Sequence, residues 1–254
     1  MRPQQRDTRG ASAPFCIVAD MSDESPHPPP SRNPAVCSLR RRDWAAFAAR
    51  TLAGWALGYH RLVVSGAEHL PRQGAALILP KHCAYRDILV EGVVLHRFTR
   101  RFATYVMKVG LWGVLEALGG IKVIRPKDVR RLKDHQARRE EIRRARELNQ
   151  ETFDYLAWLY ARGELVLSHP EGMRFQQGMG PLQKEIIDHL VQVERERGLR
   201  VPLIPIGLQY ESFARPGARV FVRIDAPLYT DQFADRQALM AALDQRLRQL
   251  SGWT

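Results

Sequence analysis

The chain of 254 residues is poor in cysteine and contains no long apolar run. Its three cysteines, Cys16, Cys37 and Cys83, form neither a metal-ligand spacing nor an even-numbered disulfide framework, which indicates a reducing compartment. No segment reaches the roughly 18 to 20 apolar residues that cross a bilayer, and the N-terminus lacks the charged-then-apolar pattern of a secretory signal. We therefore expect any membrane contact to be peripheral or monotopic.

Acidic residues are also few compared with basic ones. Lys and Arg number 39 against 27 Asp and Glu, so the net charge is +12. Such an excess predicts a polyanionic partner: nucleic acid, an anionic membrane face or a phosphate-bearing substrate. The alternative is a soluble enzyme whose composition is simply basic. No interleaving of aromatic and basic residues and no known nucleic-acid motif accompanies the charge, so we do not expect nucleic-acid binding.

The composition divides the chain into three parts. Residues 1–39 are rich in proline and poor in large apolar side chains, which predicts a disordered tail, and Met21 could be the true start. Residues 40–60 begin with three arginines and continue with aromatic residues, a pattern that fits an amphipathic helix at a membrane interface or, equally well, a core helix. Residues 61–254 are expected to form one domain.

Short apolar runs alternate with helical stretches in this third part. The alternation predicts an α/β sheet with helices packed on it. The expected strands are 61–64, 75–79, 121–124, 165–168, 203–208 and 220–224. The expected helices are 86–96, 129–162, 181–197 and 231–250.

His82 and Asp87 are the first candidates for chemistry. His82 follows closely on the predicted strand 75–79, and histidine is the side chain best suited to accept a proton near neutral pH. A carboxylate on one ring nitrogen fixes the tautomer and stabilises the charged ring. Five residues along a helix turn about 140°, so the pair meets only if His82 lies in the loop and Asp87 in the first helical turn. Taken alone, the spacing fits a structural hydrogen bond as well.

A second candidate segment follows the predicted strand 165–168. Pro170 and Gly172 form a sharp turn that presents Glu171 and Arg174. The planar fork of an arginine suits a phosphate, although a solvated turn with a weak Glu–Arg pair explains the same residues.

Together with two further segments, these motifs resemble the 1-acylglycerol-3-phosphate acyltransferase family, also called the lysophospholipid acyltransferases. The family's ordered blocks are H-x4-D, a strand ending in Arg, P-E-G-x-R and a V-P-x-x-P-like strand. They are matched by His82 and Asp87, by Arg125, by Pro170, Glu171, Gly172 and Arg174, and by Val201 to Pro205. The resemblance implies a single α/β domain with a mostly buried mixed sheet flanked by helices, preceded by an amphipathic helical segment.

The resemblance also implies a reaction. An acceptor hydroxyl on lysophosphatidic acid or a related phosphate-bearing glycerolipid would attack the thioester of acyl-CoA or acyl-carrier protein. His82 would be the general base and Asp87 its orienting partner. Arg125 and Arg174 would hold the acceptor phosphate, and Glu171 and Gly172 would shape that pocket. No metal ion, cofactor or covalent acyl-enzyme is expected.

The expected setting is the cytoplasmic face of a membrane, with an anionic lipid surface as partner. Glycerol 3-phosphate and other lysophospholipids are alternative acceptors. A non-catalytic lipid-binding protein of the same fold is the alternative of a different class, and the departures from the family's common residues at Ala84 and Met173 motivate it. Four positions depart from those residues in all. Lys81 replaces Asn, Ala84 replaces Ser, His169 replaces Phe and Met173 replaces Thr.

Overall fold

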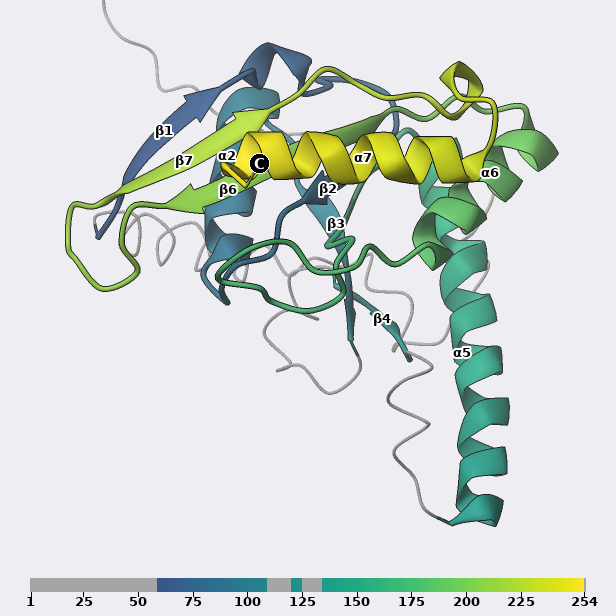
Figure 1. Ribbon diagram of the computed structural model, residues 1–254. Helices are drawn as coiled ribbons and strands as arrows, with labels where there is room; N and C mark the ends of the chain where they lie inside the picture. Colours follow the sequence, from purple (N-terminus) through teal and green to yellow (C-terminus); the bar gives the residue numbers. More distant parts are fainter. Residues whose placement is uncertain (1–58, 109–119, 125–133, 254) are drawn as a thin grey trace, which may run out of the picture.

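A computed structural model of the protein (Figure 1) describes residues 59–108, 120–124 and 134–253. The predicted tail 1–39 and all but the last two residues of the predicted segment 40–60 lie outside this part of the chain. Among the residues described, no helix is both long enough and apolar enough to cross a membrane.

A single seven-stranded sheet forms the centre of the molecule. Its strands lie in the order β1-β7-β6-β2-β5-β3-β4. Neighbours run parallel except β6 and β7, which are antiparallel, so the sheet is mixed. This confirms the predicted α/β fold with a mixed sheet. The strands are β1 (Arg61–Ser65), β2 (Ala76–Pro80), β3 (Ala103–Lys108), β4 (Ile121–Val123), β5 (Leu165–Ser168), β6 (Leu203–Tyr210) and β7 (Arg219–Ile224).

Helices cover both faces of the sheet. Apolar side chains of α2 pack on one face, and those of α5, α6 and α7 pack on the other. Figure 1 shows α7 lying along one face of the sheet, over β6, and α5 extending well beyond the edge of the sheet. The helices are α2 (Asp87–Thr99), α5 (His135–Ala161), α6 (Glu185–Arg197) and α7 (Arg236–Ser251), with short 3-10 turns η1 (Ala67–His69) and η2 (Thr230–Gln232).

Strand β2 shows why its sequence is a continuous apolar run. Leu77 and Leu79 point into the core beneath α5, α6 and α7, whereas Ala76 and Ile78 point into the core beneath α2. All four are fully buried. A strand covered on both faces has no solvent side and therefore shows no polar alternation.

The predicted strands and helices correspond to elements of the structure, with two kinds of difference. Strand β3 was not predicted, because its sequence mixes the apolar residues with Thr104, Tyr105 and Lys108. Helix α7 begins later than predicted, at Arg236, because Asp235 caps it by accepting a hydrogen bond of 2.8 Å from the backbone N–H of Ala238.

Three parallel strands bring distant parts of the chain to one edge of the sheet. Strands β5 and β6 flank β2, and both run parallel to it. The carboxyl ends of such strands meet at the same edge, where binding sites of α/β sheets commonly form. Here β2 leads into His82, β5 leads into His169, and β6 ends at Tyr210.

The close contact between β6 and α7 leaves no room for a side chain at Gly207. A Cβ added at Gly207 would lie 2.3 Å from the backbone carbonyl carbon of Leu250 in α7. Gly207→Ala should therefore push α7 away and lower the free energy of unfolding by about 1–3 kcal/mol, measured by urea denaturation. Gly92→Ala is the control, because its Cβ would come no closer than 3.7 Å to the hydroxyl oxygen of Tyr105. Equal stability of the two variants would contradict this packing.

Candidate active site

His82 and Asp87 lie together at the carboxyl edge of the sheet. Nδ1 of His82 is 3.0 Å from Oδ2 of Asp87. His82 lies in the loop after β2 and Asp87 is the first residue of α2, which is the arrangement that their spacing required. The side chain of Asp87 is fully buried and that of His82 is 12% exposed. Because Nδ1 is occupied by the carboxylate, Nε2 is the ring nitrogen left to accept a proton.

The carboxylate of Asp87 is bound by three more donors. The backbone N–H groups of Cys83 and Ala84 donate to Oδ2 at 2.5 and 2.7 Å. The hydroxyl of Tyr210 donates to Oδ1 at 2.6 Å. Tyr210 was not predicted as a site residue, because its position at the end of the apolar strand that follows Pro202 is its only signal in the sequence. With this many donors, the buried carboxylate is fixed in position and can in turn hold Nδ1 of His82.

Directly before His82, Lys81 forms a buried ion pair with Glu171. Nζ of Lys81 lies 2.9 and 3.0 Å from the two carboxylate oxygens, and both side chains are fully buried. Glu171 also accepts hydrogen bonds from the backbone N–H of His82 at 3.0 Å and of Gly180 at 2.7 Å. Glu171 thus contacts the loop that carries His82 and joins this loop to the segment that follows β5.

A second histidine packs on His82. The rings of His82 and His169 are stacked, with centroids 3.9 Å apart and planes 20° from parallel. Nε2 of His169 is 2.9 Å from Oε1 of Glu91, which is buried in α2. In the sequence, His169 stands out only as an unusual residue in its motif and nothing marks Glu91, because no local pattern links residues 78 positions apart.

Burial sets the protonation of these side chains. It lowers the pKa of His82 below its usual 6.5, although the hydrogen bond with Asp87 opposes the shift. It lowers the pKa of His169 to about 4. Burial, together with the charge of Asp87, raises the pKa of Glu91 well above its usual value. Both imidazoles are therefore neutral near pH 7, and Nε2 of His82 is free to take a proton.

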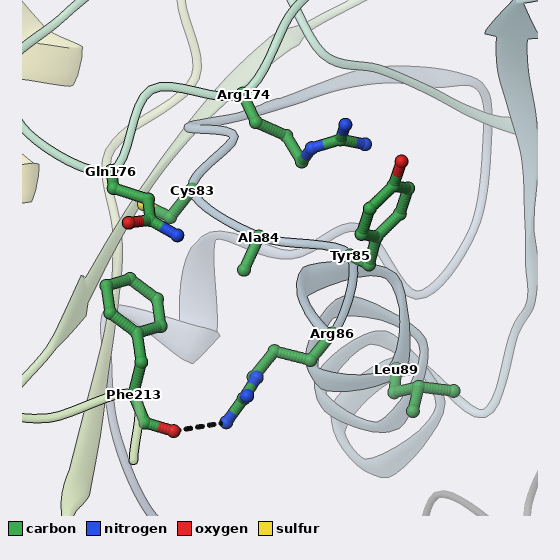
Figure 2. A pocket seen from close by; sticks show the side chains of 8 residues that line it. All are labelled: Cys83, Ala84, Tyr85, Arg86, Leu89, Arg174, Gln176 and Phe213. Carbon is green, nitrogen blue, oxygen red and sulfur yellow. Dashed lines mark hydrogen bonds between the residues drawn. The ribbon is translucent and has the colours of Figure 1, made fainter.

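An open pocket of about 720 Å³ begins at the residue after His82 (Figure 2). The guanidinium of Arg174 lies 3.5 Å from the centre of the Tyr85 ring at this pocket, and both side chains are exposed. Arg86 is held in place because it donates a hydrogen bond of 2.9 Å to the carbonyl oxygen of Phe213. The pocket thus combines two guanidinium groups with apolar surface. Its lining residues are Cys83, Ala84, Tyr85, Arg86, Leu89, Arg174, Gln176 and Phe213.

Two further residues were predicted for this site, Gly172 and Arg125. Gly172 adopts a left-handed conformation with φ of 61°, as its turn required, and an added Cβ would lie 3.1 Å from Cγ of Gln183. Arg125 lies outside the described residues, so its predicted place at this site stays a prediction.

The described residues contain neither a reactive cysteine nor a cluster of metal ligands. Burial raises the pKa of Cys83 to about 12, and its thiol donates weakly to the carbonyl oxygen of Leu208, which fits a packing residue rather than a nucleophile. Within the parts of the chain that the structure covers, no group of three or more His, Cys, Asp or Glu residues is arranged to hold a metal ion.

Comparisons with known proteins identify a family and a similar fold. The model of a protein family described as Acyltransferase matches residues 61–209, which is more than half of the chain. Among solved structures, the fold is similar to the crystal structure of PlsC, the 1-acyl-sn-glycerophosphate (LPA) acyltransferase from Thermotoga maritima. That match has a TM-score of 0.52 and 16% identity, and covers 82% of this chain and 79% of that one. A search of curated proteins found no match.

The buried ion pair yields a stability prediction. Lys81→Met leaves the carboxylate of Glu171 buried without its counter-ion, which should lower the free energy of unfolding by about 3–5 kcal/mol. The double variant Lys81→Met, Glu171→Met should recover most of this loss, because no unpaired charge remains. Arg200→Met is the control, since it breaks the exposed Arg200–Asp231 pair and should change little. A double variant less stable than Lys81→Met would contradict the pairing.

Proposed function

The chain belongs to the acyltransferase family, and from this premise we propose that it moves a fatty acyl group from a thioester to a hydroxyl of a phosphate-bearing glycerolipid. The proposed acceptor is lysophosphatidic acid or a close relative, and the proposed donor is acyl-CoA or acyl-carrier protein. The observation that carries the proposal is His82, whose Nδ1 is held by a buried carboxylate beside a pocket that contains Arg174.

The chemistry follows from the two ring nitrogens of His82. Nδ1–H donates to Asp87, so Nε2 takes the proton of the acceptor hydroxyl as its oxygen attacks the thioester carbonyl. Asp87 stabilises the imidazolium that forms. The carbon–sulfur bond then breaks, and the thiolate leaves with the proton that His82 had taken. The reaction needs no metal ion or cofactor, because the thioester is already activated.

Arg174 is the proposed anchor for the acceptor phosphate. Its guanidinium is exposed at the pocket and stacks on Tyr85, so the ring orients the planar fork without using its N–H donors. Arg125 is the proposed second anchor, from the strand end where the family motif puts it. Arg174 directly follows the turn around Glu171 and Gly172, and the Lys81–Glu171 pair ties that turn to the His82 loop.

The proposed setting is the anionic face of a membrane, where the acceptor lipid resides. Two features support it. The net charge of +12 favours anionic headgroups. In addition, Tyr85 and Met173, next to Arg174 in space and in sequence respectively, are 65% and 47% exposed. An aromatic ring and an apolar side chain beside a phosphate-binding arginine suit contact with the headgroup layer.

An acceptor panel tests the proposal. The full chain is incubated with radiolabelled acyl-CoA or acyl-carrier protein and with lysophosphatidic acid, glycerol 3-phosphate or lysophosphatidylethanolamine. We expect acylation of a phosphate-bearing acceptor, and His82→Ala should lower kcat by about 10²- to 10⁴-fold because it removes the general base. His135→Ala, which changes an exposed histidine at the start of α5, is the control. Full activity of His82→Ala, or no acylation by the intact chain, would refute the proposal.

The phosphate anchor makes a separate prediction. Arg174→Gln should raise KM for lysophosphatidic acid roughly 10-fold, because a bidentate charge-assisted contact is lost, and should leave KM for uncharged monoacylglycerol unchanged. Arg200→Gln is a matched control, since Arg200 also stacks on an aromatic ring, that of Tyr229, at 3.8 Å. The same KM change for both acceptors would show that Arg174 does not bind the phosphate.

A further inference from the structure

Helix α2 presents two carboxylates, one turn apart, and each contacts a histidine. Asp87 and Glu91 are four residues apart, so they lie on the same helix face. Asp87 holds His82 at 3.0 Å, and Glu91 holds His169 at 2.9 Å. The two imidazoles stack with 3.9 Å between their centroids. The site therefore contains two His–carboxylate pairs side by side, of which the mechanism above uses one.

We propose that His169, held by Glu91, is a positioning residue that fixes the ring plane of His82. This inference rests on the proposed function only in taking His82 as the group that accepts the proton. His169 itself takes no proton from the acceptor. It acts through the face of the His82 ring.

A single hydrogen bond leaves the His82 ring loosely oriented. The χ2 torsion of histidine lies in a broad well, so the ring can tilt about its contact with Asp87 while the 3.0 Å distance is kept. A flat partner only 20° from parallel blocks that tilt. Nε2 then keeps one direction, and catalytic groups need an orientation held to about 10–20°.

Glu91 makes His169 a rigid partner. Glu91 is buried, and its Oε1 contacts Nε2 of His169, so that ring is fixed at its far end. The other oxygen of Glu91 is buried without a hydrogen-bond partner, which a neutral carboxyl tolerates better than a carboxylate. Burial raises the pKa of Glu91 and lowers that of His169, so it disfavours charge on both members of the pair, which provides a firm surface against the His82 ring.

The absence of charge on His169 matters, because His82 becomes cationic during the reaction. Two imidazolium rings 3.9 Å apart would repel each other, so a positioning ring has to stay neutral. Burial keeps it so by lowering the pKa of His169 to about 4, against the opposing effect of nearby carboxylates. The titratable groups around the two rings come from α2, β3, β6 and the loops after β2 and β5. They are Asp87, Glu91, Tyr105, Tyr210, Lys81, Cys83 and Glu171.

Variants at His169 and Glu91 test the proposal through kcat and KM. His169→Ala removes the stacked ring and should lower kcat roughly 10-fold with the acceptor KM unchanged, because the ground-state contacts remain. His169→Phe keeps a flat ring, so its kcat should fall less than that of His169→Ala. Glu91→Leu frees His169 and should resemble His169→Ala, whereas Glu91→Gln keeps a hydrogen bond and should restore most of the activity.

A matched control is His189→Ala. His189 is also partly buried, stacks on Phe153 at 4.7 Å and has its pKa lowered by burial to about 4, but it lies in α6. This variant should keep wild-type kcat. Wild-type kcat in both His169→Ala and Glu91→Leu would overturn the proposal, as would a Glu91→Gln variant as impaired as Glu91→Leu.

Histidine NMR without substrate separates this inference from the proposed function. In the wild-type chain, ¹⁵N shifts should show His82 in one tautomer, with the proton on Nδ1, and His169 should titrate near pH 4. In His169→Ala, the His82 signals should broaden and shift because the ring samples more orientations, while the proton stays on Nδ1, which still contacts Asp87. Identical His82 spectra in the two proteins would overturn the inference even if acyl transfer is observed. If no acceptor is acylated, the spectra still test the positioning role.

Discussion

The whole site depends on the burial of one carboxylate, that of Asp87. A buried carboxylate is costly unless donors surround it. The donors come from separate elements: the loop after β2 supplies two backbone N–H groups, and the end of β6 supplies the hydroxyl of Tyr210. His82 is placed by the same carboxylate. The loop, the first turn of α2 and the end of β6 therefore form one interdependent unit, and its position follows from the parallel alignment of β2 and β6.

The sequence predicted the fold where the signal was local. Strands β2, β5 and β6 are continuous apolar runs because helices cover both faces of the sheet, and those runs were readable. The same holds for the pair His82 and Asp87, whose spacing implied a loop followed by a helix start. Strand β3 was missed because three of its six residues are Thr, Tyr and Lys, so its apolar character is interrupted. Arg125 lies outside the described residues, so its predicted position at the site stays a prediction.

The parts of the site that could not be predicted are contacts between distant residues. Tyr210 reaches Asp87 across 123 positions, and Glu91 reaches His169 across 78. A tyrosine at a strand end and a glutamate within an apolar helix have no local pattern that marks them. Lys81 was noted only as a departure from the family's common residue, yet it neutralises the buried Glu171 and so joins two motifs 90 positions apart. Sheet topology, rather than spacing, brings these residues together.

The single turn of α2 between Asp87 and Glu91 also limits how this protein can vary over evolution. Inserting or deleting one residue within that turn would rotate Glu91 by about 100° relative to Asp87, and the two histidines would lose their common support. Substitutions at Ile88 and Leu89, which are only partly buried, leave the angle unchanged. Homologues that retain both carboxylate–histidine pairs should therefore differ in residue type within this turn and never in its length.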